Sequence, residues 1–128
     1  NHEVEKFCST NLKKYKVVKN LGQIKYLSAL KHVDLVIGNS SSGIVEAASF
    51  GTPTVNIGER QKGRLRNEKV IDCQIESLEN SISLALSDLF VSKCKKIENL
   101  YGNGNASEVI VKELEQQLFF RTKKFFDL

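Results

Sequence analysis

Residues 36–66, which read VIGNSSSGIVEAASFGTPTVNIGERQKGRLR, constrain the fold of this chain more than any other segment. An apolar run at 35–37 is followed at once by a polar turn of asparagine, three serines and glycine. Residues 44–50 have helical character and end at Gly51, just before a proline, where a helix would stop. Residues 54–57, which follow this proline, are expected to form the next strand. This order predicts strand, turn, helix and strand, the repeating unit of an α/β fold with a parallel sheet and helices on both faces.

The rest of the chain adds further elements. Apolar spacing predicts helices at 1–11 and 24–31, and short β-type runs predict strands at 15–18 and 70–71. Ser77 is expected to cap a helix with an apolar side, formed by Ile82, Leu84, Ala85, Leu89 and Phe90. A glycine–asparagine loop then precedes a last helix, marked by Val109, Ile110, Val111, Leu114 and Leu118.

Composition narrows the class of protein. The 128 residues suit one α/β lobe, and 41% hydrophobic with 27% charged residues excludes a disordered chain. No apolar run approaches the ~20 residues that span a bilayer, so we expect no membrane partner. The net charge of +4 is spread over three clusters without a recognisable module, so we expect no nucleic-acid partner. Three widely spaced cysteines without a C-x-x-C pair favour the reducing cytoplasm.

The beginning of the chain predicts a piece of a longer protein. No methionine occurs anywhere, and the first residues already read as the middle of a helix. A domain of this class normally opens with a strand, and no strand is available before Asn1. We therefore expect an incomplete sheet that exposes an unpaired edge or an uncovered helix face, and marginal stability.

The polar turn is the first candidate for ligand binding. Ser40, Ser41, Ser42 and Gly43 precede the predicted helix, where hydroxyls and backbone N–H groups can hold a phosphate. An ordinary helix cap is the alternative, although one serine would suffice for it. Glu46 follows about one turn later and can accept hydrogen bonds from two neighbouring hydroxyls of a sugar, such as a ribose diol. A solvated helix glutamate is the alternative there.

A basic segment follows the second strand. Arg60, Lys62, Arg64 and Arg66 alternate with uncharged residues and can close on a diphosphate, with Arg60 the favoured cation. A solvated loop is the alternative reading of this charge run. We assign no catalytic role to the two histidines, and the sequence contains no metal cluster, catalytic triad or dinucleotide fingerprint. The residues therefore predict a nucleotide or sugar-phosphate binding lobe without cofactor, metal or catalytic groups.

The string GNSSSGIVEAASFGTPTVNIGERQKGR, preceded by LGQIKYLSALKHVDLVI, closely resembles the UDP-N-acetylglucosamine 2-epimerase family. The late YGNGNAS motif also fits, and the NSSSG and GERQKGR spellings favour the hydrolysing branch over the D-S-G-G-x-x-E-E loop of the other branch. The resemblance implies the C-terminal lobe of a two-lobed, Rossmann-like glycosyltransferase-B fold. It further implies that the backbone around Leu21 contacts uracil, Ser40 and Ser41 hold the diphosphate, Glu46 grips the ribose, and Arg60 faces the nucleotide.

The same resemblance implies the reaction. The family removes the C2 proton of UDP-N-acetylglucosamine, eliminates UDP in the anti sense, and adds water to give N-acetylmannosamine for sialic acid synthesis. Its acid and base groups would lie upstream of Asn1, so we expect no turnover from this chain without the N-terminal lobe. A homo-oligomer is compatible with the full-length form. The alternatives are a glycosyltransferase-B lobe with the same UDP site and a non-catalytic nucleotide-binding module.

Four phenylalanines near the end suggest a contact with that other lobe. They bracket the basic cluster 121–124 and are Phe119, Phe120, Phe125 and Phe126. We expect some of these rings to pack on the N-terminal lobe, and the alternative is that they cover this lobe's own core.

Overall fold

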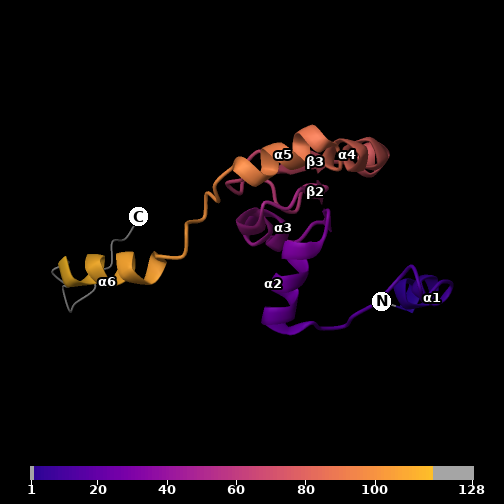
Figure 1. Ribbon diagram of the computed structural model, residues 1–128, viewed down its shortest axis with the longest axis horizontal. Helices are drawn as coiled ribbons and strands as arrows, with labels where there is room; N and C mark the ends of the chain where they lie inside the picture. The colour runs from indigo at the N-terminus through magenta and orange to yellow at the C-terminus, as the bar shows by residue number, and fades with distance from the viewer. Residues whose placement is uncertain (1, 117–128) are drawn as a thin grey trace, which may run out of the picture.

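The computed structural model describes residues 2–116 (Figure 1). In chain order its elements are α1 (His2–Ser9), α2 (Gly22–His32), β1 (Val36–Gly38), α3 (Ser42–Val45), the 3-10 helix η1 (Ala47–Phe50), β2 (Thr54–Ile57), β3 (Val70–Cys73), the 3-10 helix η2 (Ile75–Ser77), α4 (Leu78–Ala85), α5 (Asp88–Lys96) and α6 (Ala106–Gln116). The expected Leu118 position and the four C-terminal phenylalanines lie outside the described residues.

The strands form a parallel sheet in the order β1-β2-β3. Val36 pairs with Thr54, and Thr54 pairs with Val70, so the three strands start level with one another. Their carboxyl ends therefore lie at one edge of the sheet, and the loops after β1 and β2 leave from that edge. This arrangement confirms the predicted α/β class and the strands at 54–57 and 70–71.

Helices cover both faces of the sheet. Val55 is fully buried and packs with Cys73 of β3 and Ala85 of α4. The neighbouring Thr54 points to the other face, since side chains alternate along a strand, and its hydroxyl donates to the carbonyl of Gly43 in α3 (2.8 Å). Figure 1 shows β2 between α4 on one side and α3 with α2 on the other. The predicted two-sided packing is confirmed.

The helix expected over 44–50 is divided in two. Glu46 still donates to Ser42 as in an α-helix (3.0 Å), but Ser49 then donates to Glu46 with the shorter spacing of a 3-10 helix (3.0 Å). Gly51 ends the segment as predicted, in the left-handed conformation (φ 69°), and its N–H is directed to the carbonyls of Ala47 and Ala48. The tighter last turn satisfies carbonyls that a longer α-helix would leave free at this end.

The prediction of a strand at 15–18 is wrong. These residues have no regular structure, and Val17 and Val18 are exposed. The Tyr15 ring packs instead on Phe7 of α1, with ring centroids 4.9 Å apart. Figure 1 shows this segment as a connection between α1 and α2 that runs away from the sheet. A β-type sequence forms a strand only beside a partner edge, and here it has none.

The prediction of a single helix after Ser77 is also wrong, because two helices form there. Ser77 stands at the start of α4 but donates to the carbonyl of Gln74 (3.2 Å) instead of capping the helix. Ser87 interrupts the helical run and accepts from the N–H of Phe90 (3.4 Å), which starts α5. Leu89 is 84% exposed, so the predicted apolar side does not continue past the break.

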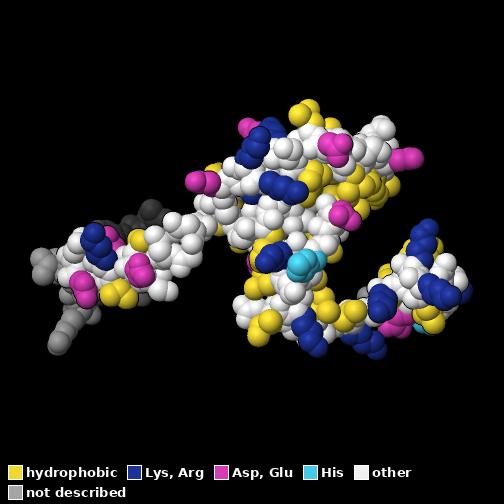
Figure 2. All heavy atoms as spheres, viewed as in Figure 1, with side chains coloured by type: hydrophobic (Ala, Val, Ile, Leu, Met, Phe, Trp, Pro, Cys, Tyr) yellow, Lys and Arg dark blue, Asp and Glu magenta, His cyan; other side chains and the backbone are white. Residues whose placement is uncertain are grey.

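The first and last described helices stand apart from the sheet (Figure 1). They confirm the helices predicted near both ends, and α2 confirms the one at 24–31. Val4 and Phe7 of α1, and Val109 and Ile110 of α6, are each more than half exposed. Figure 2 accordingly shows hydrophobic side chains on the surface of both helices. Among the described residues no helix is long and apolar enough to cross a bilayer.

Candidate functional site

Two loops meet at the carboxyl edge of the sheet. We call residues 39–43, after β1, the serine loop, and residues 58–69, after β2, the basic loop. The carbonyl of Asn39 accepts hydrogen bonds from Arg60 Nη1 (3.1 Å) and Gln61 Nε2 (2.7 Å). The fold therefore brings the predicted cation Arg60 to the loop that carries Ser40 and Ser41.

The serine loop uses two of its backbone N–H donors internally, and a third bond leads into α3. The N–H of Ser42 donates to Ser40 Oγ (3.3 Å), and those of Gly43 and Ile44 donate to the carbonyls of Ser40 (3.2 Å) and Ser41 (3.0 Å). The third serine is tied to α2, because its hydroxyl shares a hydrogen bond with Tyr26 (2.5 Å). Since α3 is a single turn, its dipole is weaker than that of the longer helix predicted. Hydroxyl groups and cations are thus available at this edge to hold an anion.

Gly43 has a packing role that the sequence did not reveal. It is buried, and a Cβ at this position would lie 2.7 Å from Cγ2 of Thr54 and 3.6 Å from Cγ1 of Val36. Normal contacts between carbon atoms are about 3.5–4.0 Å. The missing side chain therefore lets α3 lie directly on β1 and β2, which sets the position of the serine loop.

A pocket of about 320 Å³ opens between α2 and β1. It brings together Leu21, Ser40 and Gly43, and its wall is mainly apolar, with Tyr26 and Val36 among its residues. An apolar cavity with polar groups at one side suits a nucleobase with an attached polar group. Three of the predicted site residues thus lie around one pocket.

Glu46 is not part of that pocket lining. It is exposed at the junction of α3 and η1, one turn beyond the serines. Ser41 is at the start of α3, half-buried, with no capping hydrogen bond from its side chain. Their expected contacts with a ribose and a diphosphate stay predictions.

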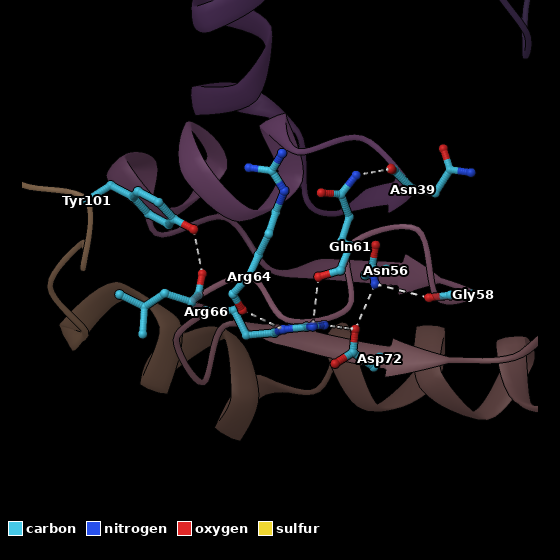
Figure 3. A network of polar contacts seen from close by, with 9 residues as sticks. Asn39, Asn56, Gly58, Gln61, Arg64, Arg66, Asp72 and Tyr101 are labelled. Atoms are coloured by element: carbon cyan, nitrogen blue, oxygen red, sulfur yellow. Dashed lines mark hydrogen bonds and ion pairs between the residues drawn. The ribbon is translucent and has the colours of Figure 1, made fainter. Parts of the chain in front are cut away.

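The base of the basic loop is anchored by a polar network (Figure 3). Arg66 forms an ion pair with Asp72 of β3 and donates from Nη2 to the carbonyl of Gln61 (2.9 Å). Asn56 of β2 is 2% exposed and donates from Nδ2 to Asp72 (2.7 Å) and weakly to the Gly58 carbonyl (3.5 Å). The network joins β2, β3 and both ends of the loop's first turn, so the loop leaves the sheet in a defined direction.

A second pocket, of about 400 Å³, lies beside this network. Its charged lining residues include Glu59, Lys62, Arg66 and Asp72. Lys62 pairs with Glu59 at 3.3 Å, and Arg66 pairs with Asp72, so the charges at this pocket are largely balanced. This wall carries charged groups, in contrast to the mainly apolar pocket between α2 and β1.

Lys69 closes the basic loop from its other end. Only 2% of this residue is exposed, and its Nζ donates to the carbonyl of Ala48 in η1 (2.7 Å). Burial lowers the pKa of Lys69 below its usual value of 10.5. Burial likewise raises the pKa of the nearby Cys94 thiol. The loop end is thus fixed to the segment that carries Glu46.

The histidines lie away from these loops. His32 ends α2, before the start of β1, and therefore sits at the opposite edge of the sheet from the serine loop. His2 begins α1, which stands apart from the sheet. Within residues 2–116 no group of His, Cys, Asp and Glu is arranged to hold a metal ion.

Comparison with known proteins identifies the family. Residues 1–115 match the family model described as UDP-N-acetylglucosamine 2-epimerase. The chain belongs to this family. Two relatives carry the word hydrolyzing in their names.

Three relatives illustrate the range of this epimerase family. A Campylobacter jejuni protein named GDP/UDP-N,N'-diacetylbacillosamine 2-epimerase (hydrolyzing) is 48% identical over 81 residues, which are 63% of this chain and 21% of that protein. A Legionella pneumophila protein named UDP-N,N'-diacetylbacillosamine 2-epimerase (hydrolyzing) is 38% identical over 93 residues, 73% of this chain and 24% of that protein. The Escherichia coli polysialic acid biosynthesis protein P7 is 32% identical over 127 residues, 98% of this chain and 32% of that protein. The chain thus spans between 21% and 32% of these relatives' lengths.

Sequence reasoning on this epimerase-family chain missed the residues that join the two loops. Gln61 and the Asn39 carbonyl make the direct contact, and Asn56 with Asp72 anchors the base. One signal was available, because Asn56 interrupts an apolar strand and a buried amide requires partners. Gln61 carried no such signal, since its contact depends on how the basic loop folds back.

Proposed function

We propose that this chain is the UDP-sugar-binding lobe of a hydrolysing 2-epimerase that converts UDP-N-acetylglucosamine and water to N-acetylmannosamine and UDP. The observation that carries the proposal is the contact of Arg60 with the carbonyl of Asn39, directly before Ser40 and Ser41. A guanidinium beside two hydroxyls is a suitable site for a diphosphate. Membership in the epimerase family supports this choice of ligand.

Each predicted residue has a role in this proposal. Uracil would enter the apolar pocket beside the backbone of Leu21, and the diphosphate would lie over Ser40 and Ser41 against Arg60. The exposed carboxylate of Glu46 would accept hydrogen bonds from the ribose hydroxyls. Gly43 would act indirectly, because its packing against β2 sets the position of the serines.

The lobe would assist the reaction through its leaving group. Elimination of UDP develops negative charge on the diphosphate, and cations and hydroxyls already in position stabilise that charge in the transition state. Removal of the C2 proton and addition of water would use groups of an N-terminal lobe that completes the cleft. We therefore expect the 128-residue chain to bind UDP and to release no UDP from the sugar nucleotide on its own. Release of UDP by the pure chain would contradict this expectation.

UDP-N,N'-diacetylbacillosamine is a second candidate substrate. The Campylobacter jejuni and Legionella pneumophila relatives carry this sugar in their names, and the former is 48% identical to this chain over the matched residues. The two sugar nucleotides share the UDP moiety, so both are compatible with the same binding lobe. The sialic acid route is supported by the name of the Escherichia coli relative. A glycosyltransferase with the same lobe would instead transfer the sugar to an acceptor, and the upstream sequence would separate these activities.

The proposal is tested by a two-dimensional amide NMR titration of this chain with UDP, with ADP as the control. A dispersed spectrum in which Ser40, Ser41, Glu46 and Arg60 shift with UDP and not with ADP is the expected result. A dispersed spectrum that UDP leaves unchanged would refute the presence of a complete uridine site in this chain. Equal shifts with ADP would refute selectivity for uridine and leave a general diphosphate site.

A further inference from the structure

One backbone carbonyl in the site receives two side-chain donors of different character. Asn39 O accepts from Gln61 Nε2 at 2.7 Å and from Arg60 Nη1 at 3.1 Å. Gln61 is 3% exposed, whereas Arg60 is an exposed residue. The shorter bond thus comes from the buried neutral amide, and the longer bond comes from the exposed cation.

We propose that Gln61 is a positioning residue that holds the Asn39 carbonyl, so that Arg60 can leave it and bind an anion on the serine loop. This inference rests on the proposed function for the identity of the anion, a nucleoside diphosphate. It adds separate roles for two adjacent residues: Gln61 fixes the loop, and Arg60 moves to the ligand.

The strengths of the hydrogen bonds favour these separate roles of Gln61 and Arg60. A guanidinium forms stronger, charge-assisted and often bidentate hydrogen bonds with phosphate than with a neutral carbonyl. When Arg60 moves, the Asn39 carbonyl keeps its bond to Gln61 and is not left without a partner. Without Gln61, Arg60 would be the remaining side-chain donor to this carbonyl, and anion binding would have to break that bond.

Gln61 is held in this orientation at a cost. Its backbone carbonyl accepts from Arg66, which is paired with Asp72, so the anchored base of the basic loop fixes the residue. Its side-chain Oε1 is buried without a hydrogen-bond partner among the described residues. A buried unpartnered acceptor destabilises a fold, and such groups call for an explanation other than stability. The explanation we infer is that this orientation points the side-chain N–H of Gln61 to the carbonyl of Asn39. Figure 3 shows the amide nitrogen of Gln61 turned to the Asn39 carbonyl.

The test begins without ligand, on the carbonyl-carbon chemical shift of Asn39, which reports hydrogen bonding to that oxygen. The proteins are the wild type, Arg60→Ala, Gln61→Met and the double variant, with Gln116→Met at the exposed end of α6 as the matched control. We expect Arg60→Ala to change the shift slightly, Gln61→Met to change it more, and the double variant to change it by more than the sum of the two. Equal changes from Arg60→Ala and Gln61→Met, or strict additivity, would overturn the proposal. Gln61→Leu, which also lacks the donor and adds no charge, replaces Gln61→Met if that variant does not fold.

The second arm measures the dissociation constant for UDP with the same proteins. Loss of one net hydrogen bond corresponds to about a 3- to 10-fold weaker Kd for Gln61→Met. Arg60→Ala should weaken binding less in the Gln61→Met background than in the wild type, because Arg60 is then retained by the carbonyl. A merely structural role for Gln61 would leave the effect of Arg60→Ala the same in both backgrounds, and that result would refute the positioning role. The ligand-free cycle thus tests Gln61, and wild-type UDP binding tests the proposed function, so the two can fail separately.

Discussion

Substitution of Gly43 by alanine should destabilise the fold through one identifiable contact. The new Cβ would lie 2.7 Å from Cγ2 of Thr54, a buried side chain of β2. Overpacking of this kind costs about 1–3 kcal/mol. Rotation of Thr54 to relieve it would break the 2.8 Å hydrogen bond from its hydroxyl to the Gly43 carbonyl, which contributes about 1 kcal/mol. The higher helix propensity of alanine returns about 1 kcal/mol, so we expect a net loss of about 1–3 kcal/mol.

The assay is urea unfolding followed by circular dichroism, with a compensating variant. Thr54→Ser removes Cγ2, the atom in closest contact, and keeps the hydroxyl that bonds Gly43. Alone, it should cost about 1 kcal/mol for the lost buried methyl group. Combined with Gly43→Ala, it should recover most of the loss, because the overlap disappears.

The double-mutant cycle tests whether the contact with Thr54 causes the loss of stability in Gly43→Ala. A coupling free energy of about 1–3 kcal/mol between the two substitutions is expected from the contact. Additive losses would show that the 2.7 Å overlap does not determine the need for glycine. In that case the packing role assigned to Gly43 would be refuted.

Two further perturbations test other parts of the fold. Gly51→Ala places a Cβ on a residue with φ of 69°, 3.2 Å from Cα of Lys95, and should lower the free energy of unfolding by about 1–3 kcal/mol in urea titrations. An unchanged midpoint would contradict the left-handed helix end. Lys69→Met tests the buried amine. Burial lowers the pKa of Lys69 in the folded state, so the unfolded state binds more protons at pH values between that pKa and 10.5. In this pH range Lys69 therefore makes the free energy of unfolding of the wild type rise with pH. The stability difference between the wild type and Lys69→Met should therefore grow in favour of the wild type as the pH approaches 10.5, and a difference independent of pH would contradict burial of the amine.

The sequence predicted best where a residue's conformation depends on its near neighbours. β2 forms at the expected bounds and β1 within one residue of the apolar run 35–37, although Ile37 is 47% exposed and β2 contains the buried Asn56. Gly51 ended the helical segment as expected, because a left-handed residue strongly favours glycine. These features need no knowledge of the rest of the fold.

Prediction failed where the outcome depends on distant partners. Residues 15–18 have strand propensity and form no strand, because no sheet edge is available beside them. The candidate residues Leu21, Ser40 and Gly43 do lie around one pocket, and Arg60 does reach the serine loop. The contact of Gln61 with Asn39, 22 positions apart, could not be foreseen, since a glutamine in a basic run carries no local signal of its partner.

The basic loop combines a fixed base with a tip that is free to vary. Buried or paired groups at Asn56, Arg66 and Lys69 hold its ends, while Lys62 and Arg64 are exposed. Mutations at the tip therefore change charge and shape at the edge of the sheet with little effect on folding. Mutations at the base, by contrast, are expected to destabilise the fold. Such a separation lets a lineage, or a protein engineer, alter what this edge recognises by successive single substitutions, each of which leaves a folded protein.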